Sequence, residues 1–112
     1  MKQQDVYLDH VIECIEWINR HVTEGRDVFL KDRKTQSAVL REFQTMAEST
    51  QRLSLEQKQQ YPAVPWEAIA GFRNLLVHDY LGIKLERVWE IIQRDIPVLR
   101  TAVEAMKKEA LR

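Results

Sequence analysis

Five polar residues interrupt the otherwise apolar segment GFRNLLVHDYLGI at positions 71–83, namely Arg73, Asn74, His78, Asp79 and Tyr80. Their types suit RNA cleavage without a metal ion, which needs a base for the 2′-hydroxyl proton, an acid for the leaving oxygen and a fixed cation for the phosphorane. A histidine titrates near neutral pH and can serve as the base or the acid. An arginine stays charged and presents a planar fork of donors that matches phosphate oxygens. The segment is therefore a candidate active site.

The spacing of these residues limits how one helix can present them. At about 100° per residue, Asn74 and His78 share a helix face, while Arg73 and Tyr80 are nearly eclipsed on a neighbouring face. Arg73 and His78 are separated by about 140° on an ideal helix, so they are not a same-face pair. Three arrangements could bring Arg73 and His78 together. The long guanidinium side chain of Arg73 could extend around the helix, the helix could loosen near Asp79, or a second copy of the chain could complete the site.

A non-catalytic interpretation of the same residues is also open. A histidine in the last turn of a helix stabilises the negative end of the helix dipole without any further role. Arg73 could form a surface ion pair, and Tyr80 could pack at the rim of a helical bundle. Spacing alone does not separate these interpretations.

Hydrophobic periodicity predicts the elements that must position the segment. A long amphipathic helix is expected through the apolar residues from Leu8 to Val22, with Gly25 just past its end. RDVFLKDRK follows as an irregular or short helical connector, and a second helix is expected over about residues 35–53. Ser54 and Gln57 have the spacing of a capping box, which predicts a short helix there.

The second half of the chain continues this pattern. Pro65 suits the first turn of a helix over about residues 66–80 that closes near Gly82. An apolar stripe from Leu85 to Met106 predicts a last helix, which Pro97 should kink or split. We therefore predict a single all-α domain over residues 1–112, a bundle of four to five helices.

Composition narrows the class of protein. The 112 residues are 45% apolar and 30% charged. The 17 basic and 17 acidic residues give no net charge, so the overall charge does not indicate a nucleic-acid partner. No signal peptide and no run of about 18 apolar residues is present, which predicts a soluble cytoplasmic protein without a membrane partner. Cys14, the single cysteine, lies among helical core positions and is expected to be a buried thiol. His10 and His21 lack metal-ligand spacing, so we predict no metal site and no cofactor.

Other chemistry-bearing residues have simpler explanations. Acidic residues interrupt a set of cations in the first third of the chain, which favours a solvated face over an RNA-binding rim. Three tryptophans could stack on bases, although apolar neighbours at helical spacing favour core or dimer-interface positions. The cations are Arg20, Arg26, Lys31, Arg33 and Lys34, and the tryptophans are Trp17, Trp66 and Trp89.

The segment RNLLVHDY matches R-x-x-x-x-H-x-Y, and in this respect the chain resembles the HepT-type toxins with HEPN domains. TQSAVLREFQTMAESTQRLS resembles the second helix of that family, and PWEAIAGFRNLLVHDYLGIKLERVWEIIQRDIPVLR resembles its third and fourth helices. With the first helix, the resemblance covers essentially the whole chain. It implies a HEPN helical bundle and a metal-independent ribonuclease, acting as a homodimer in which two arginine–histidine motifs face a shared cleft.

The resemblance also implies roles for individual residues. Arg73 and His78 would be the catalytic pair, with Asn74 and Asp79 supporting them. Tyr80 would be modified with AMP by a cognate antitoxin, a minimal nucleotidyltransferase (MNT) that needs ATP and magnesium, as in a type VII-like toxin–antitoxin pair. Glu48 lies where relatives carry a glutamate, and we expect it to pair with a basic residue or to support the cleft. The alternative is a non-catalytic HEPN module that binds a nucleotide or its partner.

Overall fold

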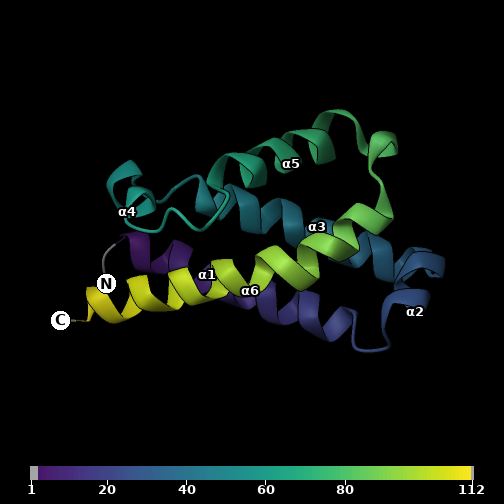
Figure 1. Ribbon diagram of the computed structural model, residues 1–112, viewed down its shortest axis with the longest axis horizontal. Coiled ribbons are helices and arrows are strands. Elements are labelled where there is room, and N and C mark those ends of the chain that lie inside the picture. The colour runs from purple at the N-terminus through teal and green to yellow at the C-terminus, as the bar shows by residue number, and fades with distance from the viewer. Residues whose placement is uncertain (1–2, 112) are drawn as a thin grey trace.

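The computed structural model describes residues 3–111, which form six α-helices and one short 3₁₀-helix (Figure 1). The all-α prediction is confirmed, but the described residues form six α-helices where four or five were expected. In chain order the elements are α1 (Gln3–His21), α2 (Arg26–Lys31), α3 (Arg33–Thr50), α4 (Leu55–Gln59), α5 (Trp66–His78), η1 (Tyr80–Gly82) and α6 (Leu85–Ala110).

Two short helices account for the higher number. The charged connector folds as α2 because Phe29 is fully buried there, and its carbonyl oxygen accepts a hydrogen bond from Nε2 of Gln36 at 2.9 Å. Gly25 turns the chain between α1 and α2 with a φ of 95°, a conformation that favours glycine. The predicted capping box of α4 is confirmed, since Ser54 and Gln57 each bind the backbone N–H of the other.

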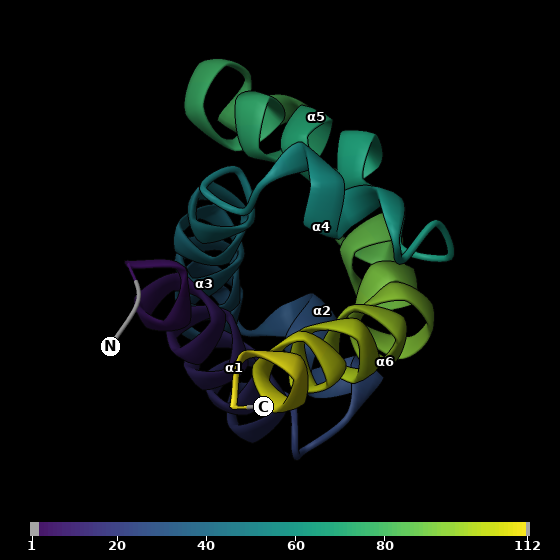
Figure 2. The same ribbon diagram turned by 90° about the vertical axis from the view of Figure 1, so that its left-hand side faces the viewer.

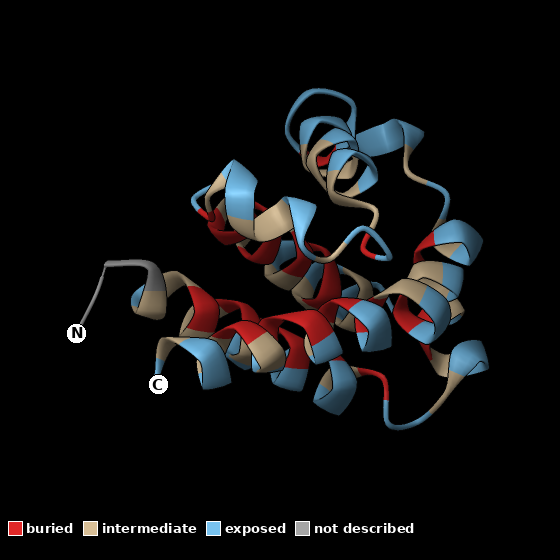
Figure 3. Ribbon diagram, turned by 60° about the vertical axis from the view of Figure 1, so that its left-hand side comes forward, coloured by how far each residue is buried: buried red, intermediate tan, exposed pale blue. Residues whose placement is uncertain are grey.

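Three long helices build the core. The helix α1 packs against both α3 and α6, and α5 packs mainly on α3 (Figures 1 and 2). Buried residues gather on the sides of the helices that face one another (Figure 3). No described helix has the combination of length and apolar character needed to span a bilayer. The fully buried side chains at the centre are Leu8, Val11, Ile15, Ile18, Phe29, Val39, Val88 and Val103.

Two expected helix boundaries differ from the structure. The last helix, α6, continues through Pro97 as one element, so the predicted split does not occur. Pro97 lies on the exposed side, and the Oγ1 of Thr101 donates a hydrogen bond to its carbonyl oxygen at 3.1 Å. The helix α5 ends at His78 and not at Tyr80, because the backbone of Asp79 leaves the helical region with φ −145° and ψ 55°.

The start of α5 is held by the preceding linker. Trp66, the first residue of the helix, donates its indole N–H to the carbonyl oxygens of Lys58 at 3.0 Å and Tyr61 at 3.1 Å. Val64, within this linker, is buried. These contacts attach α5 at the end opposite to the candidate active site.

Candidate active site

The end of α5 determines where the polar residues of the segment lie. The backbone N–H of Asp79 donates the last helical hydrogen bond, to the carbonyl oxygen of Leu75 at 2.8 Å. The chain then forms the 3₁₀ turn η1, in which the N–H of Gly82 donates to the carbonyl oxygen of Asp79 at 3.0 Å. His78 is thus the final helical residue, and Tyr80 opens a separate turn two positions later. The two side chains belong to different elements.

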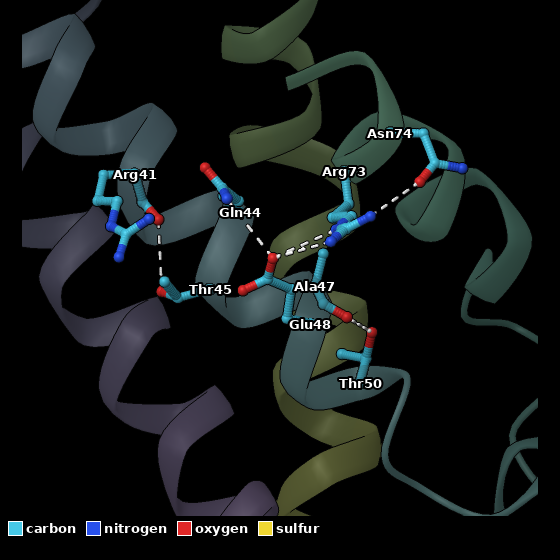
Figure 4. A network of polar contacts seen from close by, with 8 residues as sticks. All are labelled: Arg41, Gln44, Thr45, Ala47, Glu48, Thr50, Arg73 and Asn74. Atoms are coloured by element: carbon cyan, nitrogen blue, oxygen red, sulfur yellow. Dashed lines mark hydrogen bonds and ion pairs between the residues drawn. The ribbon is translucent and has the colours of Figure 1, made fainter. Parts of the chain in front are cut away.

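Arg73 is held against α3 and not against His78. Its Nε and Nη2 donate hydrogen bonds to one carboxylate oxygen of Glu48, at 3.3 and 3.2 Å, and Nη1 donates to Oδ1 of Asn74 at 3.3 Å (Figure 4). Gln44, one turn before Glu48, donates to the same oxygen at 3.5 Å. The expectation that Glu48 pairs with a basic residue is confirmed.

His78 has a different environment from Arg73. Its side chain is exposed, and no hydrogen bond or ion pair joins it to any residue that the structure describes. The helix is regular up to His78, so it does not loosen between the two residues, and the guanidinium of Arg73 points to α3. Within one chain, therefore, neither an extended Arg73 side chain nor a loosened helix brings Arg73 and His78 together.

The remaining residues of the segment surround this end of the helix. Asn74 is exposed and contributes its amide oxygen to Arg73, so it contacts the cation directly. Tyr80 is 49% exposed, and its neighbour Leu81 is 97% exposed. Asp79 lies over Gly82, where its carboxylate fills the space that a side chain would need. The turn therefore leaves Tyr80 half-exposed beside the helix end.

A broad groove of about 910 Å³ runs beside the segment, between α5 and the first half of α6. Its α5 wall is apolar and includes Phe72 and Leu75, while three cations lie on its other side. Sequence analysis did not single out these cations, Lys84, Arg87 and Arg94, although their spacing of three and seven residues places them on one helix face. Glu90 and Asp95 form ion pairs with Arg87 and Arg94, at 3.8 and 3.4 Å.

Cys14 and His10 form a small polar cluster between α1 and α3. The Nδ1 of His10 lies 2.6 Å from Oγ of Ser49, and the sulfur of Cys14 lies 3.5 Å from Oγ1 of Thr45. Cys14 is buried as expected, and burial raises the pKa of its thiol to about 11. Among the described residues, no group of three or more His, Cys, Asp or Glu side chains is arranged to hold a metal ion.

The other candidates lie outside the segment of residues 71–83. The five cations of the first third of the chain are all exposed, in agreement with a solvated face. Trp66 and Trp89 are half-buried against the core. Trp17 is not a core residue, because it is 42% exposed, stacks on His21 and lies under the guanidinium of Arg20. A position at a dimer interface stays a prediction for Trp17.

Two known proteins of similar length are similar in sequence to this chain. It is 33% identical over 103 residues to "Probable ribonuclease HepT" of Thermococcus cleftensis, covering 91% of this chain and 94% of that protein. It is 34% identical over 111 residues to "Putative RNase TTE0752" of Caldanaerobacter subterraneus subsp. tengcongensis, covering 97% and 99% of the two chains. No solved structure matches the chain at a significant level.

A larger protein also contains a related segment. The chain is 30% identical over 109 residues to "Gamma-glutamylcyclotransferase and putative RNase MJ0434" of Methanocaldococcus jannaschii, and its match spans about half of that protein, 49%. The family model described as "Ribonuclease HepT-like" matches residues 11–106, which include all of α3 and α5 and the whole Arg73–Tyr80 segment. This chain belongs to the HepT-like ribonucleases, the HepT-type family of HEPN proteins.

Proposed function

We propose that this chain is the toxin of a toxin–antitoxin pair, a metal-independent endoribonuclease that acts as a homodimer on transfer or messenger RNA. The observation that carries the proposal is the end of α5, where an anchored arginine lies five positions before an exposed histidine whose side chain has no partner among the described residues. Membership of the HepT-like ribonuclease family supports the same reaction class.

The chemistry assigns a role to each residue. His78 takes the proton of the 2′-hydroxyl group, and the resulting oxygen attacks the neighbouring phosphorus. Arg73 stabilises the extra negative charge of the phosphorane through N–H groups that Glu48 and Asn74 leave free. The bond to the 5′-oxygen then breaks, and a protonated imidazole returns a proton to that oxygen. The products are a 2′,3′-cyclic phosphate and a 5′-hydroxyl end, and no oxidant or metal is required.

A homodimer accounts for the surface of α5. The helix is apolar over most of its length, yet Leu76 is its one buried residue. Leu75 and Val77 of α5 are 47% and 42% exposed, and Leu81 of the following turn is 97% exposed, so these side chains could add apolar area to an interface. A second copy packed here would place two Arg73–His78 motifs across a shared cleft. Arginine from one protomer could then face histidine from the other, despite the separation of about 140° within each helix.

Modification of Tyr80 would silence this site. Tyr80 is half-exposed in the turn that directly follows His78, which supports access by an enzyme that transfers AMP. Each AMP adds a negatively charged phosphate and a nucleoside near Arg73 and His78, where they compete with RNA. The proposed partner is an MNT-type nucleotidyltransferase antitoxin that supplies the AMP from ATP.

Paired expression tests the proposal. The wild type and His78→Ala are each expressed without the partner, and total and transfer RNA are sized. We expect arrested growth and shortened RNA in the wild type alone. Intact RNA and healthy cells in both, from folded protein, would support instead a non-catalytic module that binds a nucleotide or its partner. RNA cleavage retained in both Arg73→Ala and His78→Ala would end the catalytic assignment.

A further inference from the structure

We propose that Glu48 of α3 is a positioning residue that orients the guanidinium of Arg73 toward the RNA phosphate. The inference rests on the proposed ribonuclease function and deepens it. Glu48 does not touch the reacting atoms in this role; it acts through Arg73. The contact joins residues 25 positions apart, from two different helices.

The hydrogen bonds of Arg73 determine which donors remain for a ligand. A guanidinium has five N–H groups. Nε and Nη2 each give one to Glu48, and Nη1 gives one to Asn74, so one N–H on Nη1 and one on Nη2 remain. They lie on the two nitrogens whose shared edge can bind two oxygens of one phosphate. Glu48 and Asn74 thus engage three of the five N–H groups, and the other two remain available to a phosphate.

The pair is partly shielded and is itself held in place. The side chains of Arg73 and Glu48 are 29% and 39% exposed, so solvent screens the contact only in part. Gln44 donates to the same carboxylate oxygen from one turn away on α3 (Figure 4). An arginine fixed in this way loses little side-chain freedom when a phosphate binds, whereas an unanchored one must be ordered at that moment.

Glu48 could instead act as an electrostatic brake, because its negative charge repels phosphate. The two roles predict opposite results. Removal of a brake would speed cleavage, while removal of a positioning residue slows it. The number of donors that Glu48 engages favours positioning, since two N–H groups bound to one oxygen restrict rotation of the guanidinium.

The proposal is tested with Glu48→Ala and Glu48→Gln, each purified as folded protein. Their steady-state rates are measured on an RNA that the wild type cleaves. We expect Glu48→Ala to lower kcat on the order of 10²-fold, the effect of a displaced catalytic group, with little change in KM. Glu48→Gln keeps an oxygen that accepts from Nε and Nη2, so its loss should stay below about tenfold. Glu67→Ala, on the exposed surface of α5, is the control and should cleave like the wild type.

The outcomes separate this proposal from the one on which it rests. A wild type that cleaves no RNA would end the ribonuclease proposal and the role of Glu48 with it. An active wild type with Glu48→Ala at the same rate or faster would overturn the positioning role alone. Equal losses in Glu48→Ala and Glu48→Gln would also overturn it, because they would assign the effect to the negative charge and not to orientation.

Discussion

The carboxylate of Asp79 occupies the space in which a side chain on Gly82 would begin. An ideal Cβ at position 82 would lie 2.5 Å from Oδ2 and 2.8 Å from Cγ of Asp79, closer than real Cβ contacts. Gly82 does not have a positive φ, so its backbone conformation does not require glycine. The lack of room for a side chain explains the residue instead. The turn that presents Tyr80 therefore couples an aspartate to a glycine three residues later.

A double-mutant cycle between these two positions should show the coupling. In the Asp79→Ala background, Gly82→Ala should stabilise the fold by about 0.4–1 kcal/mol, because alanine restricts the unfolded chain. With Asp79 present, the same change must displace the carboxylate, and we expect a loss of up to about 1 kcal/mol. Urea unfolding of the four proteins measures the difference. Equal effects of Gly82→Ala in both backgrounds would contradict the steric explanation.

Mixed dimers should reveal whether the two proposed catalytic groups, Arg73 and His78, come from different protomers. Arg73 binds α3 and His78 points elsewhere, so we expect each site to combine the arginine of one copy with the histidine of the other. Arg73→Ala and His78→Ala would each be inactive alone, but their mixture would contain dimers with one intact site. RNA cleavage by the co-expressed variants should recover in proportion to the fraction of mixed dimers.

The control for this complementation is a mixture in which one chain carries both substitutions. A dimer of that double variant with either single variant has no intact site under any arrangement, so it should stay inactive. If the two single variants also stay inactive when mixed, although mixed dimers form, the arginine and histidine of one chain must act together.

The exposed leucine of the turn should support dimer formation. Leu81 is 97% exposed, and burial of a leucine side chain contributes about 1.5–3 kcal/mol. We therefore expect Leu81→Glu to weaken the dimer by at least tenfold, as sedimentation velocity at several concentrations would measure. Leu55→Glu is the matched control, because Leu55 is 71% exposed on α4, away from the candidate active site. Equal dissociation constants for both variants would place the interface elsewhere.

Tyrosine variants test the proposed modification of Tyr80 with AMP. Tyr80→Phe removes the hydroxyl of a half-exposed residue and should stay folded, since surface substitutions change stability by roughly 0.5 kcal/mol or less. Incubation with the nucleotidyltransferase and ATP should then give no mass increase. Tyr61→Phe, a half-buried tyrosine in the linker before α5, should gain the same mass as the wild type. An unchanged mass increase on Tyr80→Phe would show that another residue is modified.

The buried thiol predicts a pH dependence of stability. Burial raises the pKa of Cys14 from 9.0 to about 11, so the folded protein keeps this proton over a range in which the unfolded chain loses it. The stabilisation is complete below the unfolded pKa and is lost as pH rises toward 11. The Tm of the wild type should fall more steeply above pH 9 than that of Cys14→Ala. Parallel curves for the two proteins would show that the thiol titrates normally.

Local pattern determined most of the secondary structure. The apolar stripes of α1, α3 and α6 have the helical period, and the Ser54–Gln57 box follows from spacing alone. The R-x-x-x-x-H-x-Y motif and the resemblance to HepT-type proteins were likewise readable from the chain. Such features depend on residues within one or two turns of one another, so a linear sequence carries them directly.

Tertiary structure decided how the residues of the site are used. Glu48 and Arg73 meet only because α5 packs across α3, and the resemblance had placed a glutamate there without naming its partner. The exposure of Trp17 and the groove between α5 and α6 also depend on which helices pack together. Helical periodicity predicts which residues share a face of a helix. The rotation and register of the packed helices determine which residues of other helices that face contacts. That is why the motif was visible in the sequence and the anchoring of its arginine was not.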